Sequence, residues 1–226
     1  MDMGKLVDLV ADGHSFQGYF SEAGPEKPGV IVIQEWWGLV DHIKDVTDRF
    51  AEAGFNAFAP DLYHGQAAAE PDTAKKLAME LQLENASKEI SKAAKYLKEI
   101  GSGKIGIIGF CMGGTLSVWG ATLTPEITSA VAFYPGTSWE RHNPQWRNMK
   151  GKKVVIHCSE GDGTSAAPGI QEAITNIKKY GGDGKAFDYP GTQHAFFNDD
   201  RPQVYNKEAA QLSWQRTLEF FTENLN

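Results

Sequence analysis

The sequence predicts an α/β fold in which a mostly parallel sheet carries helices on both faces. Short β-branched apolar runs alternate along the chain with longer segments whose apolar residues recur at helical spacing, a pattern typical of βαβ units. The 24 glycines and 10 prolines are spread over all 226 residues and supply the turns that such alternation needs. No internal repeat, low-complexity linker or break in composition is present. We therefore expect one domain spanning residues 1–226, with no separate lid domain.

The first half of the chain begins with a predicted antiparallel hairpin at one edge of the sheet, turning at Asp12-Gly13. The following run, residues 29–34, is apolar and β-branched throughout, which indicates a strand buried on both faces. Glycine or proline closes most of the later segments, as expected where a helix or strand must end. The other predicted elements of this half are hairpin strands 5–10 and 15–20, helix 41–53, strand 55–59, a partly helical stretch 67–83 and helix 85–100.

The second half continues the alternation and brings the expected sheet to about seven or eight strands. The helix after residue 109 is expected to run to about residue 122. Residues 135–148 form the longest irregular stretch, and its Trp139 and Trp146 must pack against something. The predicted elements here are strands 104–109, 129–134, 153–158 and 185–189 and helices 167–180 and 205–225.

Charge and cysteine content exclude several classes of protein. Twenty-nine acidic and 22 basic residues give a net charge of −7, which argues against a nucleic-acid or anionic-membrane surface. The two cysteines, Cys111 and Cys158, fit a reducing compartment better than a disulfide scaffold. The first 20 residues have no apolar segment typical of a signal peptide, and no apolar run approaches the ~18 residues of a membrane span. We expect a soluble cytoplasmic protein.

The strongest chemical signal is a G-x-C-x-G sequence, residues 109–113, between a predicted strand and a predicted helix. With serine at its centre this would be the nucleophile elbow of the α/β-hydrolases, in which the glycines allow a sharp turn between strand and helix. The central side chain, here Cys111, would then stand at a helix N-terminus, which favours a thiolate. The alternative is that Cys111 is a small buried residue beside packing glycines.

Two further residues stand where this fold places its acid and its base. In chain order the nucleophile is followed by the acid and then by histidine. Asp162 follows the strand 153–158, and His194 follows the strand 185–189. His194 would take the thiol proton, and Asp162 would orient the imidazole. Taken one at a time, Asp162 could be an ordinary turn residue and His194 a loop residue without a catalytic role. Glu160, two residues before Asp162, is a rival for the role of the acid.

The oxyanion of an acyl-transfer intermediate needs two backbone N–H donors. Met112, the residue after the candidate nucleophile, and Trp36, on the loop after the strand 29–34, stand at the expected places. Glu35, next to Trp36, is unusual because a carboxylate just beyond a buried strand needs a partner. A structural ion pair with an arginine or lysine would supply one.

Taken together, these motifs resemble the dienelactone hydrolase family over nearly the whole chain, from about residue 29 to residue 221. The resemblance rests on Gln34-Glu-Trp-Trp-Gly38, Pro60-Asp-Leu-Tyr63, Gly109-Phe-Cys-Met-Gly-Gly114, Asp162 and Gly191-Thr-Gln-His-Ala-Phe196. It implies an α/β-hydrolase fold with a catalytic triad of Cys111, Asp162 and His194. It also implies that Glu35 holds the resting thiol and releases it when substrate arrives. The implied reaction is acyl transfer to sulfur followed by hydrolysis.

The substrate pocket is expected to be apolar and aromatic, because aromatic residues flank each of these motifs. Dienelactone hydrolases that act on a muconolactone-type acid hold its carboxylate with two arginines. The matching positions here are His64-Gly65 and Asn198, and Arg201, Arg141 or Arg147 could substitute. The sequence thus supports an ester or lactone without a carboxylate as well as it supports a muconolactone-type acid. The residues expected at the pocket are Trp36, Trp37, Phe110, Tyr134, Trp139, Phe196, Asn198 and Arg201.

The sequence contains no further cofactor or metal motif. Residues 101–106 match G-x-G-x-x-G but precede a strand, whereas a dinucleotide fingerprint must follow one. The six histidines show neither H-E-x-x-H nor comparable spacing, so we expect no metal site and no cofactor. We predict a monomeric or homodimeric hydrolase of a small ester or lactone. The alternative is a degenerate member of the fold that has lost catalysis and binds a ligand or a protein partner.

Overall fold

The computed structural model describes residues 4–136 and 139–225. Eight strands form one sheet in the order β1-β2-β4-β3-β5-β6-β7-β8. β2 is antiparallel to both β1 and β4, and all other neighbours are parallel. The predicted mostly parallel sheet with an antiparallel hairpin at its edge is thereby confirmed. The strands are β1 (Lys5–Ala11), β2 (His14–Ser21), β3 (Gly29–Ile33), β4 (Asn56–Pro60), β5 (Ile105–Phe110), β6 (Ile127–Phe133), β7 (Lys153–Ser159) and β8 (Asp183–Tyr189).

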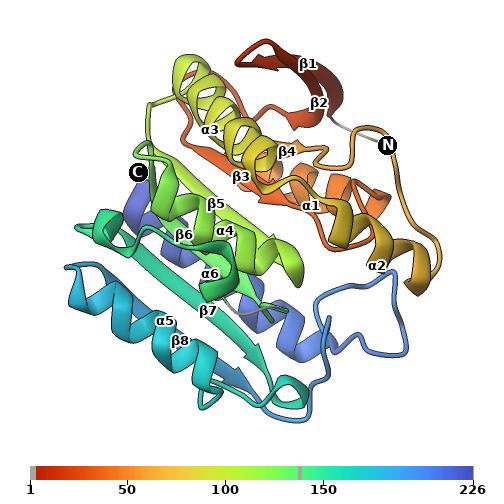
Figure 1. The fold of residues 1–226 in the computed structure, drawn as a ribbon, viewed down its shortest axis with the longest axis vertical. Coiled ribbons are helices and arrows are strands. Elements are labelled where there is room, and N and C mark those ends of the chain that lie inside the picture. The colour runs from red at the N-terminus through yellow and green to blue at the C-terminus, as the bar shows by residue number, and fades with distance from the viewer. Residues whose placement is uncertain (1–3, 137–138, 226) are drawn as a thin grey trace.

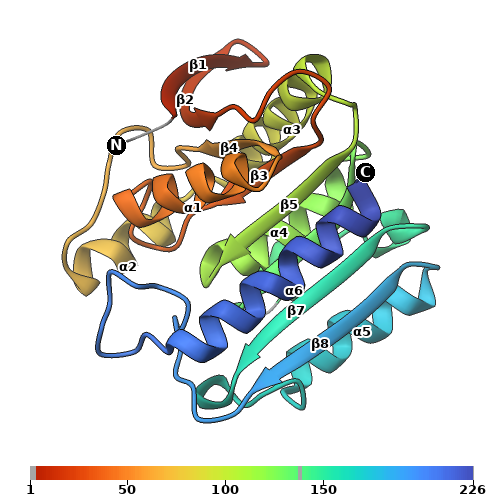
Figure 2. The same ribbon diagram turned by 180° about the vertical axis from the view of Figure 1, so that it is seen from behind.

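Helices cover both faces of the sheet. Helices α3, α4 and α5 lie in front of it in Figure 1, and α1 and α6 lie in front of it when the molecule is turned around in Figure 2. The inner strands β3, β4 and β5 are buried along their whole length, which is why their sequences are apolar without alternation. The helices are α1 (Asp41–Glu52), α2 (Pro71–Glu80), α3 (Leu83–Ile100), α4 (Met112–Leu123), α5 (Pro168–Lys179) and α6 (Lys207–Leu225).

Two predicted segments differ in detail from the structure. The partly helical stretch 67–83 becomes helix α2 only from Pro71, which occupies the first helical turn, whereas Ala67 pairs with Gly38 in an isolated bridge. The irregular stretch 135–148 contains the short 3₁₀ helix η1 (Trp139–His142) and the start of η2 (Trp146–Met149), and its residues 137 and 138 lie outside the described residues. Trp139 is buried and donates its indole N–H to the carbonyl of Thr115 in α4 at 3.0 Å.

The topology brings four loops to one edge of the sheet. Strands β3, β5, β7 and β8 run parallel, so the residues that follow them emerge at the same edge. Glu35 follows β3 and Cys111 follows β5. Asp162 ends the 3₁₀ helix η3 (Glu160–Asp162) directly after β7, and His194 lies on the loop after β8. The described residues thus gather every candidate catalytic side chain at one place.

Candidate active site

Cys111 stands at a strained junction between β5 and α4. Its φ of 56° and ψ of −119° are unusual for a residue with a side chain, and such conformations cost of order 1–3 kcal/mol. Four hydrogen bonds hold the backbone there: the Cys111 N–H donates to the Phe133 carbonyl, and the N–H groups of Gly114, Thr115 and Gly136 donate to the Cys111 carbonyl. A Cβ on Gly109 would collide with Gly113, and one on Gly113 would collide with Gln34. The glycines of the motif therefore let strand and helix approach and raise the thiol above the sheet.

His194 and Asp162 form a hydrogen-bonded pair. His194 Nδ1 lies 2.8 Å from Asp162 Oδ2, which also accepts a hydrogen bond from Ser159 Oγ at 2.5 Å. Burial raises the pKa of Asp162, but the hydrogen bonds from His194 and Ser159 outweigh it and lower that pKa. Burial lowers the pKa of His194, but hydrogen bonds with Asp162 and Cys111 outweigh it and raise that pKa to about 10. His194 is thus a base that holds its proton firmly, between an ionised carboxylate and the thiol.

Glu160, the rival acid, has a different partner. Its Oε2 accepts the backbone N–H of Gly191 at 2.8 Å, on the loop that leads from β8 to His194. The carboxylate of Glu160 therefore fastens the loop, whereas that of Asp162 contacts the imidazole. The geometry favours Asp162 as the residue that orients His194.

The backbone N–H of Met112, next to Cys111, is suited to receive an oxyanion. Met112 is the first residue of α4, so its N–H has no partner inside the helix. A Cβ on Gly136 would lie 3.2 Å from Cys111 Sγ and 3.6 Å from the Met112 nitrogen, so glycine leaves room beside both atoms. Trp36 lines the same cavity as Cys111. A carbonyl carbon held against the sulfur could thus direct its oxygen to the Met112 N–H.

A cavity of about 580 Å³ opens above the thiol, which is a volume suited to a small molecule. Cys111 and His194 lie in its wall together with Trp36, Trp37 and Arg201. The sequence did not indicate the remaining wall, which comes largely from α2 and the segment after it. Its residues are Ala78, Met79, Leu81, Leu83, Leu116 and His142.

Five residues expected at the pocket lie outside the wall of this cavity. Phe110 and Phe196 are fully buried in the core beneath the sheet edge, where Phe110 stacks on Phe197 at 5.3 Å between ring centroids. Tyr134, like Trp139, lines a smaller adjoining cavity of about 270 Å³ that also contains Asp162. Asn198 is buried and lies outside the described cavity wall.

Glu35 is almost completely buried, with 1% exposure, yet it lines the cavity beside Cys111. Its Oε2 accepts a hydrogen bond from Asn198 Nδ2 at 2.8 Å. Its Oε1 has no hydrogen-bond partner among the described residues, and none of the ion pairs among them includes Glu35. Among the described residues, Glu35 therefore forms no structural ion pair with an arginine or lysine. That Glu35 holds the resting thiol, as the resemblance implies, stays a prediction.

Arg201 is the residue with a permanent positive charge among the described residues of the cavity wall. Its guanidinium lies 5.4 Å from the ring centroid of Trp37, within the range of a cation–π contact. Arg141 and Arg147 are not part of this wall, and His64 contacts Glu89 outside it. The described cavity wall therefore contains one arginine, whereas dienelactone hydrolases that act on a muconolactone-type acid hold its carboxylate with two.

The second cysteine belongs to the core. Cys158 is buried in β7, and burial raises the pKa of its thiol to about 12. Both cysteines are free. Among the helices of the described residues, none has the length and apolar character needed to cross a membrane.

Comparison with known proteins places the chain in a family. The model of the dienelactone hydrolase family matches residues 16–225. Two relatives are Protein usf of Aquifex pyrophilus, 35% identical over 99% of this chain and 100% of its own length, and a candidate carboxymethylenebutenolidase of Aquifex aeolicus, 33% identical over 97% and 98%.

Solved structures share the fold. A candidate dienelactone hydrolase from Klebsiella pneumoniae is 24% identical, with a TM-score of 0.81 over 97% of this chain and 98% of its own. A dienelactone hydrolase-like promiscuous phosphotriesterase from metagenomic libraries is 22% identical, with a TM-score of 0.84 over 99% and 98%. From its sequence match and its α/β-hydrolase fold, the chain belongs to the dienelactone hydrolase family and is a carboxylic ester hydrolase.

Proposed function

We propose that this chain hydrolyses a small carboxylic ester or lactone through an acyl-enzyme on Cys111. The observation that carries the proposal is the position of the thiol. It stands at a strained strand–helix junction, in the wall of a cavity that can hold a small molecule, and His194 lies in the same wall. A reducing compartment, as expected from the two free cysteines, would keep such a thiol active.

In the first half of the reaction, His194 holds the proton given up by the Cys111 thiol, and the sulfur attacks the carbonyl carbon. The oxygen of the tetrahedral intermediate then carries the negative charge and accepts the Met112 N–H, with that of Trp36 as the second donor. When the intermediate collapses, the carbon–oxygen bond of the ester breaks and the leaving oxygen takes the proton from His194. In a lactone the leaving group stays attached to the acyl chain, so ring opening releases nothing at this stage.

In the second half, water attacks the thioester. His194 takes a proton from the water, hydroxide adds to the carbonyl carbon, and the carbon–sulfur bond breaks to give the acid and the thiol. The carboxylate of Asp162 stabilises the imidazolium in both halves and holds Nδ1 protonated, so that Nε2 faces the reacting atoms. Asp162 thus acts through His194 and does not itself contact substrate.

Two variants at Cys111 test this function. Cys111→Ala should abolish turnover of 4-nitrophenyl acetate without changing the circular dichroism spectrum, and Cys111→Ser should retain a small fraction of the rate. Wild-type protein mixed with substrate should show a burst of 4-nitrophenol and an acyl mass increment that maps to Cys111. Turnover by Cys111→Ala at the wild-type rate would refute the thiol mechanism. No turnover and no acylation in the wild type would favour a binding protein.

A substrate panel tests the acyl group. Lactones and esters with and without a carboxylate should be compared in the wild type and in Arg201→Gln, which keeps the length of the side chain but removes its charge. Because Arg201 is the described cation of the wall, any preference for acidic substrates should appear in KM and should disappear in the variant. A preference for acids that survives in Arg201→Gln would assign carboxylate binding to another residue.

A further inference from the structure

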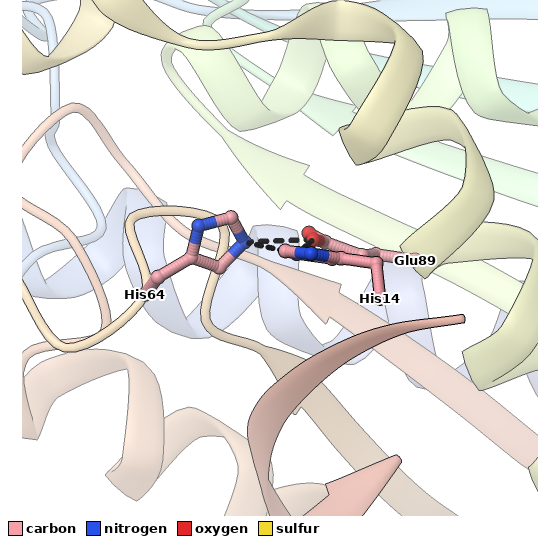
Figure 3. A group of neighbouring side chains, drawn as sticks. All are labelled: His14, His64 and Glu89. Carbon is pink, nitrogen blue, oxygen red and sulfur yellow. Dashed lines mark hydrogen bonds and ion pairs between the residues drawn. The ribbon is translucent and has the colours of Figure 1, made fainter. Parts of the chain in front are cut away.

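Three side chains from distant parts of the chain converge on one point at the surface. His14 begins β2, His64 lies on the loop after β4, and Glu89 lies on α3. Figure 3 shows the two imidazole rings and the carboxylate directed toward one another from these elements. None of the three lines the cavity above Cys111. The histidines lack a metal-binding motif spacing, so the sequence predicts no metal site, but the fold brings two of them and a carboxylate close together.

The three facing atoms are at the separations that a shared cation requires. His64 Nε2 lies 2.7 Å and His14 Nε2 lies 3.3 Å from Glu89 Oε1, and the two nitrogens are 3.5 Å apart. A triangle with these sides has its corners about 1.9 Å from its centre. A cation ~2.1 Å from each atom, the usual zinc–nitrogen and zinc–oxygen distance, would therefore sit about 1 Å out of their plane.

The carboxylate itself is the second, independent observation. Glu89 is 1% exposed, and its Oε2 has no hydrogen-bond partner. Burial raises the pKa of Glu89, and its contacts with His64 and His14 oppose that rise. Among the described residues no lysine or arginine forms an ion pair with Glu89, although a buried carboxylate ordinarily needs a charged or well-bonded partner. Only the two half-exposed imidazoles separate this buried anion from water.

The loop that carries His64 is held in place before any cation arrives. His64 has a φ of 53°, in the left-handed region that few residues other than glycine adopt. Asp61 fixes this turn, because its side chain accepts the N–H groups of Tyr63 at 3.1 Å and Gly65 at 2.5 Å, while its carbonyl accepts that of His64. Preorganised ligands lower the entropy that binding would otherwise cost.

We propose that His14 Nε2, His64 Nε2 and Glu89 Oε1 bind one Zn²⁺ or similar divalent transition-metal ion, with water completing the coordination. Two imidazoles and one carboxylate suit zinc-class ions and disfavour calcium or magnesium, which prefer oxygen ligands. The ion would neutralise Glu89 and join the edge hairpin, the loop after β4 and α3. It would therefore act on stability and not at Cys111, from which its ligands are separate.

Zinc titration of metal-free protein tests the site. The experiment uses the full chain in the Cys111→Ala background, so that Zn²⁺ cannot bind the thiol beside His194. The affinity and stoichiometry of Zn²⁺ binding are measured by titration calorimetry in competition with a chelator. Tm is measured with and without the ion. We expect one ion per chain and a higher Tm in its presence. Glu89→Gln and His64→Gln should each weaken binding by at least ~10-fold and remove the Tm shift.

Two controls keep the result decisive. His142→Gln removes a histidine on η1, outside the cluster, and should bind zinc like the parent. His14→Gln alters a side chain that is 43% exposed, so it should fold even if Glu89→Gln does not, and it should also lose binding. Absence of zinc binding in the parent, or equal binding in the parent and in the ligand variants, would overturn the proposal.

Discussion

Replacing Asp162 with asparagine removes the negative charge beside His194 but keeps a side chain of the same shape. In the place of Oδ2, which now accepts from both groups, the amide oxygen of asparagine can still accept His194 Nδ1–H at 2.8 Å and Ser159 Oγ–H at 2.5 Å. Position and packing should therefore survive the change. What is lost is the attraction between the carboxylate and the imidazolium that forms in each half-reaction.

The exposure of the pair sets the size of this loss. Unit charges ~4 Å apart attract by about 4 kcal/mol at an effective dielectric constant of 20. Both side chains are 36% exposed, so solvent screening reduces that figure, and we take about 2.7 kcal/mol as the remainder. Since each 1.36 kcal/mol changes a rate tenfold, kcat/KM should fall ~100-fold. A buried triad loses about 10⁴-fold when its aspartate becomes asparagine, so the expected loss here is smaller.

The assay is kcat/KM for 4-nitrophenyl acetate, with Glu160→Gln as the matched control. Glutamine at 160 can still accept the Gly191 N–H through its amide oxygen, so this variant should stay within about threefold of wild type. A loss in Glu160→Gln equal to or greater than that in Asp162→Asn would make Glu160 the acid. A rate near wild type in Asp162→Asn would refute the orienting role altogether.

Three further predictions test the thiol's surroundings, the buried carboxylate and the pH dependence of stability. Gly136→Ala places a methyl carbon 3.2 Å from Cys111 Sγ, so kcat/KM should fall by at least ~100-fold while Tm changes little; unchanged kinetics would mean that substrate does not enter there. Asn198→Ala removes the hydrogen bond of buried Glu35 and should lower the free energy of unfolding by about 1–3 kcal/mol in urea titrations, and an unchanged midpoint would show that water replaces the amide. Burial lowers the pKa of His157 to about 3, so the unfolded state alone binds this proton below pH ~6.5, and stability should fall by about 1.36 kcal/mol per pH unit from there toward pH 3. His157→Gln should flatten this slope, whereas an unchanged slope would assign it to carboxylates.

The pH dependence on the alkaline side has the opposite cause. The folded pKa of His194 is raised to about 10, above its unfolded value, so its contribution to stability is complete below pH ~6.5 and is lost as pH rises through 10. The two histidines therefore act in separate pH ranges. Unfolding midpoints measured between pH 4 and pH 6 report on His157 without interference from His194.

Several features of this protein could be predicted from sequence because the signals are local. Helices and strands follow from the period of apolar residues, and the mostly parallel sheet follows from their alternation. The glycines around Cys111 mark a sharp strand–helix turn, and the positions of Asp162 and His194 follow from the strands that precede them. Each of these inferences needs only a short stretch of chain or the order of elements along it.

Tertiary structure decided what depends on contacts between distant segments and on the side to which each side chain points. Phe110 and Phe196 turn into the core, and α2 supplies part of the cavity wall instead. Glu35 takes its partner from Asn198, 163 positions away, and of the three arginines that could substitute, Arg201 lies in the described cavity wall while Arg141 and Arg147 do not. The cluster of His14, His64 and Glu89 exists only because β2, the loop after β4 and α3 meet at one surface. No spacing along the chain encodes such a meeting, since packing and not sequence separation sets the distance between these side chains.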